Sequence, residues 1–137
     1  MPITELSTAA QNAATDAIVD LLDAGTGAGD LLIYDGTMPG PNAAGAGTLL
    51  VTIPLDATAF GASSSGVATI ADLDPVNWAA DGTADYWRLV DGDGDPILQG
   101  NVTVTAGDGS LKLSSITAVT GSPVDVTAFT YTTPSGE

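Results

Sequence analysis

Glycine and proline divide most of this chain into short apolar runs. All 17 glycines and all but one of the 8 prolines lie after residue 24. Glycine supplies the backbone conformations of tight turns, and proline is excluded from central strands, so this spacing predicts short strands joined by turns. The candidate strands are 31–35, 48–54, 66–71, 84–90, 96–98, 101–105, 111–119 and 124–131.

The first segment has a different pattern. Residues 7–24 contain no glycine or proline, and an apolar stripe recurs every three or four positions: Ala10, Ala14, Ala17, Ile18, Leu21 and Leu22. Ser7 or Thr8 suits the N-cap, and Gly25 suits the position after the last turn. We therefore expect one amphipathic helix of about four turns whose apolar stripe packs on the sheet. Polar residues such as Gln11, Asn12, Thr15 and Asp16 fall mainly on its other side.

The chain has the length of one domain. Its 137 residues predict a single domain over 1–137, made of the helix at 7–24, a glycine-rich connector at 25–30 and a β body at 31–137. Short turns between the late strands favour an antiparallel β-sandwich or a jelly-roll-like barrel with one N-terminal α-helix. A chain of this size buries enough surface to fold without disulfides or bound metals.

Charge excludes several partners. The chain carries 17 acidic residues against two basic ones, Arg88 and Lys112, for a formal net charge of −15. Binding to nucleic acid needs clustered Lys and Arg, and attachment to anionic lipid needs the same, so we expect neither partner.

Histidine and cysteine are both missing from the sequence. Triads and dyads that use either residue, and Cys/His zinc sites, are therefore excluded, and no nucleophile stands beside a base. We expect no enzymatic activity and no cofactor. The N-terminus lacks a basic region followed by an apolar run, so the sequence predicts a product made in the cytoplasm without a signal peptide.

Loops and turns separate the strands. Two long connections, 36–47 and 72–82, are expected on the surface, and Asp-Gly steps at 91–94 and 107–109 are expected to form tight turns. In strand 84–90, Trp87 and Leu89 share one face and are expected in the core. Arg88 lies on the opposite face, where we expect it to meet a carboxylate.

Three carboxylates alternate with glycine in the turn at 91–95. Asp91, Asp93 and Asp95 form a weak candidate calcium site, because such oxygens suit a hard cation. The loop departs from the EF-hand pattern, with Pro96 at the sixth position and Val102 at the twelfth, so an ordinary turn is the main interpretation.

Two other patterns bear on ligand binding. The glycines at 25–29 follow a helix and precede a strand, which is the reverse of a dinucleotide-binding motif, and they indicate a linker. Trp78, Tyr86 and Asp85 form a candidate sugar site, although aromatic residues in strands are more often core.

Several segments resemble small virion proteins encoded among the head and tail genes of tailed bacteriophages. They are LSTAAQNA at 6–13, DAIVDLLDAG at 16–25, LIYDGTMP at 32–39, GTLLVT at 47–52, FGA at 60–62, ADYWR at 84–88 and FTY at 129–131. The resemblance covers most of the chain in the order of its segments and includes no catalytic motif. It implies a virion structural protein.

Charge narrows the expected position in the virion. A many-copy protein at −15 is repelled by packaged DNA, so the outer capsid surface suits it better than the interior. The leading hypothesis is a capsid decoration or cement protein bound to the major capsid protein or another virion protein. A tail or head-tail connector component is the alternative, and a calcium- or carbohydrate-binding β module is the third.

The expected contacts are apolar rather than ionic. They are placed in the N-terminal segment and in the loop after the first strand, and the residues named are Pro2, Ile3, Leu6, Met38, Pro39 and Pro41. Symmetric association is common among structural proteins of this kind, so we expect a homo-oligomer, with a trimer as the first hypothesis.

Overall fold

An inner strand that is buried at every position, β5 (Tyr86–Val90), lies near the centre of the fold. In the computed structural model, which describes residues 5–23, 27–56, 60–70 and 73–133, β5 pairs with β1 (Asp30–Tyr34) and β6 (Pro96–Val104). Trp87 and Leu89 lie in the core, as expected from their shared face. The opposite face of β5 is buried as well, because the loop at 36–47 covers it.

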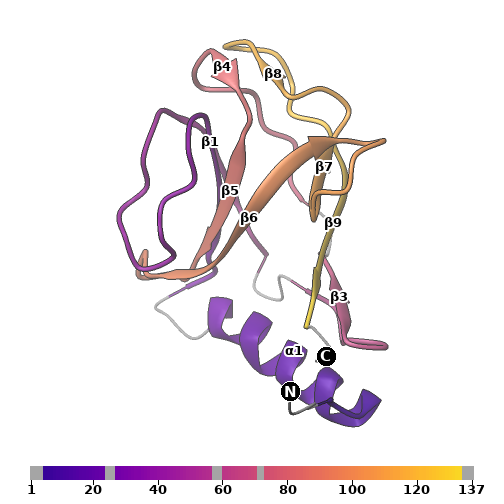
Figure 1. Cartoon of the computed structure of the whole chain (residues 1–137). Helices are drawn as coiled ribbons and strands as arrows, with labels where there is room; N and C mark the ends of the chain where they lie inside the picture. The colour runs from indigo at the N-terminus through magenta and orange to yellow at the C-terminus, as the bar shows by residue number, and fades with distance from the viewer. Residues whose placement is uncertain (1–4, 24–26, 57–59, 71–72, 134–137) are drawn as a thin grey trace.

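The remaining strands complete a curled sheet. The seven-stranded sheet has the order β2-β1-β5-β6-β7-β9-β3, and a separate pair joins β4 to β8. Figure 1 shows β1 and β5 on one side, β7 and β9 on the other, and β6 crossing between them. The further strands are β2 (Leu49–Pro54), β3 (Val67–Thr69), β4 (Gly82–Thr83), β7 (Leu111–Leu113), β8 (Thr117–Ala118) and β9 (Val126–Thr132).

The structure confirms a mainly β protein with one N-terminal helix, and its large sheet is consistent with a sandwich. Three details differ from the expectation. The segments 96–98 and 101–105 belong to one strand, β6, while 111–119 divides into β7 and β8. The short β4 lies where only a connection was expected.

One strand pair departs from the expected antiparallel arrangement. Strands β6 and β7 run parallel, although only residues 105–110 connect them. The tight turn expected at 107–109 lies instead at 105–106, where Gly107 N donates to Val104 O over 2.8 Å, and it does not make a hairpin. Gly109 N donates to Thr103 Oγ1 over 3.0 Å, and a methyl group on Gly107 would lie 2.5 Å from Thr103 Cβ. These glycines let the chain fold back closely beside the end of β6.

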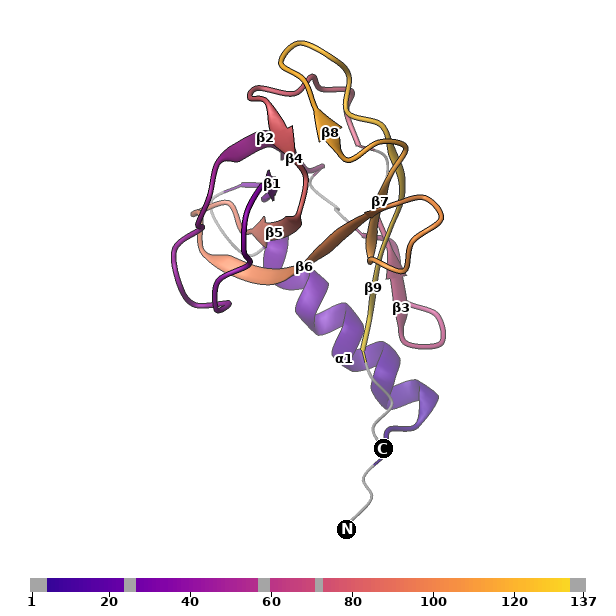
Figure 2. The same cartoon turned by 45° about the horizontal axis from the view of Figure 1, so that its top comes forward.

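The helix α1 (Thr8–Asp20) begins as the sequence predicts. Ser7 is the N-cap, and its Oγ accepts from Ala10 N over 3.2 Å. A short 3-10 helix, η1 (Leu21–Asp23), follows, while the expected C-terminal Gly25 lies outside the described residues. Figure 2 shows α1 across one end of the curled sheet.

The side of α1 that faces the sheet differs from the expectation. Thr15, Val19 and Leu22 are buried, whereas Leu21, which belongs to the expected apolar stripe, is 49% exposed. Ala10 and Ala17 are exposed too. The expected apolar docking face is wrong because backbone polar groups of residues 63–66 face the first half of α1. Such groups require hydrogen-bonding partners, which apolar side chains cannot supply.

Polar side chains of α1 meet those backbone groups. Asn12 Oδ1 accepts from Gly66 N over 2.8 Å, and Asp16 Oδ1 accepts from Ser63 N over 2.9 Å. Thr15 Oγ1 donates to Gly66 O over 2.8 Å and lies 2.7 Å from Thr133 Oγ1. Since one hydroxyl has one proton, Thr133 donates to Thr15 in this pair. The helix is thus docked by a polar first half and an apolar second half.

Candidate interaction site

The loop at 36–47, between β1 and β2, carries three of the residues expected to contact a partner. Met38 is 43% exposed and Pro41 is exposed, whereas Pro39 is half-buried. The sequence has no charged residue between Asp35 and Asp56. The loop therefore presents an uncharged surface with an apolar tip on a strongly acidic protein.

Arg88 connects the middle of this loop to the sheet. Its Nη1 donates to Ala43 O over 2.6 Å, and its Nη2 donates to Gln99 Oε1 over 2.9 Å and to Gly40 O over 3.4 Å. Gln99 in turn donates from Nε2 to Pro39 O over 2.6 Å. Arg88 is only 4% exposed, and its guanidinium spans two carbonyl groups of the loop and a neighbouring strand.

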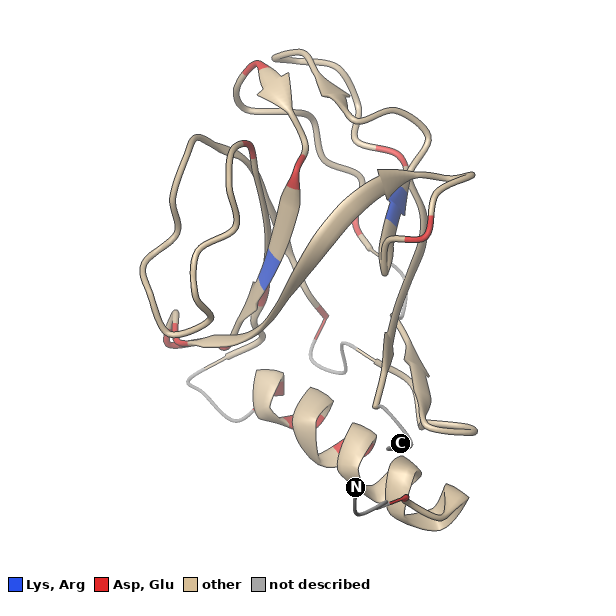
Figure 3. Cartoon of the chain, viewed as in Figure 1, with Lys and Arg blue, Asp and Glu red and all other residues tan. Residues whose placement is uncertain are grey.

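These partners correct the expectation that Arg88 meets a carboxylate. A buried guanidinium needs acceptors, and the uncharged loop that covers it supplies carbonyl oxygens in place of an acid. Its Nε is buried and has no hydrogen-bond partner among the described residues. Figure 3 shows the two basic positions of the chain, in β5 and β7, among many acidic ones.

Two tyrosines hold the C-terminal part of the loop. Tyr86 Oη donates to Ala46 O over 2.6 Å and accepts from Ala46 N over 2.9 Å. The rings of Tyr34 and Tyr86 stack with centroids 5.0 Å apart and planes 4° apart. Burial raises the pKa of Tyr34, and nearby Tyr86 adds to this rise while Arg88 opposes it. The loop therefore rests on an ordered aromatic platform.

The two ends of the loop are fixed by carboxylates. Asp35 Oδ1 accepts from Thr48 N over 2.6 Å, and Asp85 Oδ2 accepts from Gly36 N over 2.7 Å. Because its ends, middle and C-terminal part are all tied to the sheet, we call residues 36–47 the anchored loop. A surface that is ordered before binding loses less conformational entropy when a partner docks.

The other expected contact residues lie near the N-terminus. Leu6 is 39% exposed, next to the start of α1. Pro2 and Ile3 lie outside the described residues. The structure therefore leaves the N-terminal part of the expected surface as a prediction.

The acidic turn at 91–95 is built around a single carboxylate. Asp91 Oδ1 accepts from the backbone N of both Asp93 and Asp95, over 3.0 and 2.9 Å. Such bonds are ordinary turn chemistry for aspartate. Within the part of the chain that the structure describes, no group of three or more acidic side chains is placed to hold a metal ion.

The candidate sugar site is not assembled in this fold. Trp78 is 4% exposed and Tyr86 is 1% exposed, so neither ring offers a face to a ligand. Asp85 is exposed, but its carboxylate holds Gly36. These three residues serve the core and the anchored loop.

Comparisons with known proteins found no similarity. No protein-family model matches the chain, and neither a curated protein nor a solved structure matches it significantly. Among the described residues, no helix is long and apolar enough to cross a membrane.

Proposed function

We propose that this chain is a structural protein of a tailed-bacteriophage virion, bound to the outer surface of the capsid as a decoration protein. The observation that carries the proposal is the anchored loop, which combines an exposed Met38 with an ordered frame and no charge. In this proposal the loop, together with residues 2–10, contacts the major capsid protein.

The chemistry of the anchored loop suits a partner of this kind. Neighbouring copies of a protein at −15 repel one another, so attachment in many copies requires contacts that do not add to the repulsion. An uncharged apolar tip meets that requirement. The ordered frame also lowers the entropy that each docked copy loses.

The acidic surface supports an external position. Packaged DNA is a dense polyanion and repels an acidic protein inside the capsid, whereas the outer surface is free of that repulsion. No catalytic role forms part of the proposal, because the sequence lacks histidine and cysteine. A connector or tail component is the competing structural role, and the two differ in where the copies lie.

Imaging of the virion tests this proposal. Electron cryo-microscopy of particles from the phage that encodes the chain, with quantitative mass spectrometry of the same particles, gives both position and copy number. We expect density that fits this fold at repeated sites on the outer capsid, with the anchored loop toward the capsid. Density confined to the tail or neck supports the connector role instead, and absence from purified particles contradicts both.

A further inference from the structure

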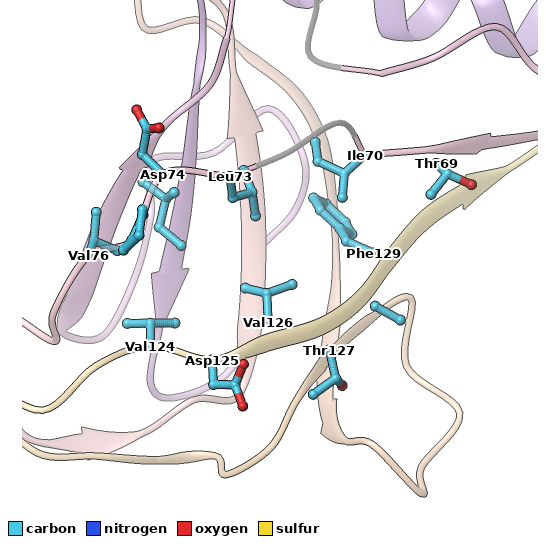
Figure 4. Close-up of a pocket in the computed structure, with 13 residues that line it drawn as sticks. Thr69, Ile70, Leu73, Asp74, Val76, Val124, Asp125, Val126, Thr127 and Phe129 are labelled. Carbon is cyan, nitrogen blue, oxygen red and sulfur yellow. The ribbon is translucent and has the colours of Figure 1, made fainter.

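A second surface feature, distant from the anchored loop, is an open groove of about 550 Å³ beside the first half of β9. Figure 4 shows the side chains that line it, which come from residues 53, 69–70, 73–76 and 124–129. We call it the β9 groove. In Figure 1 the anchored loop lies on the β1 side and β9 on the opposite side of the molecule.

Backbone hydrogen bonds join two chain segments at the two ends of the groove. Ile70 N donates to Phe129 O over 3.0 Å at one end, and Val124 N donates to Val76 O over 3.0 Å at the other. Strand β3 pairs only with residues 130–132 of β9, whereas β7 pairs with residues 126–129 from the other side. Among the described residues, 126–128 therefore have β7 as their neighbouring strand on one side, and they line the groove.

The lining combines an apolar floor with acidic rims. Ile70, Leu73, Val124 and Val126 are partly buried against the core, and Phe129 forms the buried base. Asp74 on one segment and Asp125 on the other are exposed. A partly covered apolar floor gains free energy from further burial, and carboxylates on both rims attract a cation.

We propose that the β9 groove binds an extended segment of another protein in which apolar side chains alternate with Lys or Arg. Such a segment lies beside residues 126–128 in the manner of an added strand, with its apolar side chains on the floor and its cations near Asp74 and Asp125. The inference goes beyond the proposed function, because it concerns a second surface and holds or fails without the virion.

Charge identifies the occupant as a different protein. Lys112 is the one basic side chain that a second copy of this chain offers for contact, since Arg88 is buried under the anchored loop. The rest of a copy's charge is acidic and repels the rims of the groove. A partner with alternating basic and apolar residues matches both the floor and the rims.

Peptide binding to the isolated chain tests the inference. The probe is a fluorescent hexapeptide that alternates Val and Lys, and the controls alternate Ser and Lys or Val and Glu. We expect the Val/Lys peptide to bind about tenfold more tightly than either control, because only it matches floor and rims together. In NMR spectra of the labelled chain, shifts are expected at residues 69–70, 73–76 and 124–129.

Two double variants distinguish binding in the groove from general attraction of the peptide to an acidic protein. Asp74→Asn with Asp125→Asn is expected to weaken binding of the Val/Lys peptide about fivefold. Asp20→Asn with Asp108→Asn removes the same charge from exposed positions outside the groove and is expected to leave binding nearly unchanged.

Four outcomes would overturn the inference. Equal binding of the Ser/Lys peptide, or equal weakening by the control pair, would show attraction to overall charge alone. Shifts outside the groove would place the peptide elsewhere. Self-association of the chain with shifts in the groove would identify a second copy as the occupant.

Discussion

Arg88 Nη1 donates to Ala43 O over 2.6 Å, linking an inner strand to the middle of a loop that precedes it by 45 residues. Through Gly40 and Gln99, the same guanidinium reaches two further acceptors. Arginine side chains usually lie on the surface, but Arg88 is buried and holds an uncharged loop in place by hydrogen bonds. Its removal is therefore expected to affect the loop more than the sheet.

Arg88→Met tests this role with a side chain of similar length and no donors. We expect faster amide hydrogen exchange in residues 39–46 and a loss of about 1–3 kcal/mol in the free energy of unfolding, because the hydrogen bonds from the charged guanidinium are lost. Lys112→Met removes the same charge from a half-buried position in β7 and is the matched control. Unchanged exchange in the Arg88 variant would mean that the tyrosines hold the loop alone.

Met38→Asp tests the proposed contact. We expect loss of co-sedimentation with capsids and a change of less than about 0.5 kcal/mol in stability, because the side chain is exposed. Val119→Asp adds the same charge at a position that is 50% exposed outside the loop, and its attachment is expected to remain normal. Wild-type attachment is expected to persist as salt rises, since screening weakens only ionic contacts and the repulsion between copies. Release at moderate salt contradicts an apolar contact.

Thr15→Val tests the polar docking of α1. The variant keeps the shape of the side chain and leaves Gly66 O and Thr133 Oγ1 without their buried partner. We expect urea denaturation to show a loss of about 1–3 kcal/mol. Thr15→Ser retains the hydroxyl and is expected to lose less, so a larger loss in the Ser variant argues for methyl packing instead.

Gly107→Ala tests the short parallel connection. The added methyl group would lie 2.5 Å from Thr103 Cβ, and we expect a loss of about 1–3 kcal/mol from the resulting strain. At Gly61 an added methyl group meets open space, so Gly61→Ala is the matched control. Equal melting temperatures for the two variants would show that the turn adjusts freely.

Protonation of Asp81 is expected to cause part of the loss of folding stability at low pH. Hydrogen bonds from Thr120 N and Oγ1 lower the pKa of Asp81 below its ordinary value of 3.8. The unfolded chain then takes up the proton first as pH falls, so the stabilisation is present above that value and is lost as pH falls through the folded pKa. An NMR titration of the carboxyl carbon measures this pKa directly, and Thr120→Ala is expected to raise it. A midpoint at or above 3.8 in the wild-type chain contradicts the prediction.

The sequence predicts elements whose cause is local. Alternation placed Trp87 and Leu89 in the core, and the serine before the first turn marked the start of α1. The docking face of α1 was predicted wrongly because Thr15 is buried by partners 51 and 118 residues away. The parallel pairing of β6 and β7 escaped prediction for a similar reason, since an Asp-Gly turn is typical of hairpins.

In the candidate interaction site, too, the features with a local cause were predicted and those that depend on distant residues were not. Proline and glycine content predicted an exposed loop, and the structure places Met38 and Pro41 on its surface. The residues that order the loop were missed, because Arg88, Gln99 and Tyr86 lie on strands that follow it by 40 residues or more. One signal was available: the single arginine of the chain stands in an otherwise apolar strand, on the face away from the core.

The contact between Thr15 and Thr133 has a consequence for synthesis. These residues are 118 positions apart. At roughly 5–20 residues per second, Thr15 is synthesised about 6–24 s before Thr133. During that interval Val19 and Leu22 have no complete surface to cover them. The nascent helix is therefore a natural binding point for chaperones, and any variant that slows elongation lengthens its exposure.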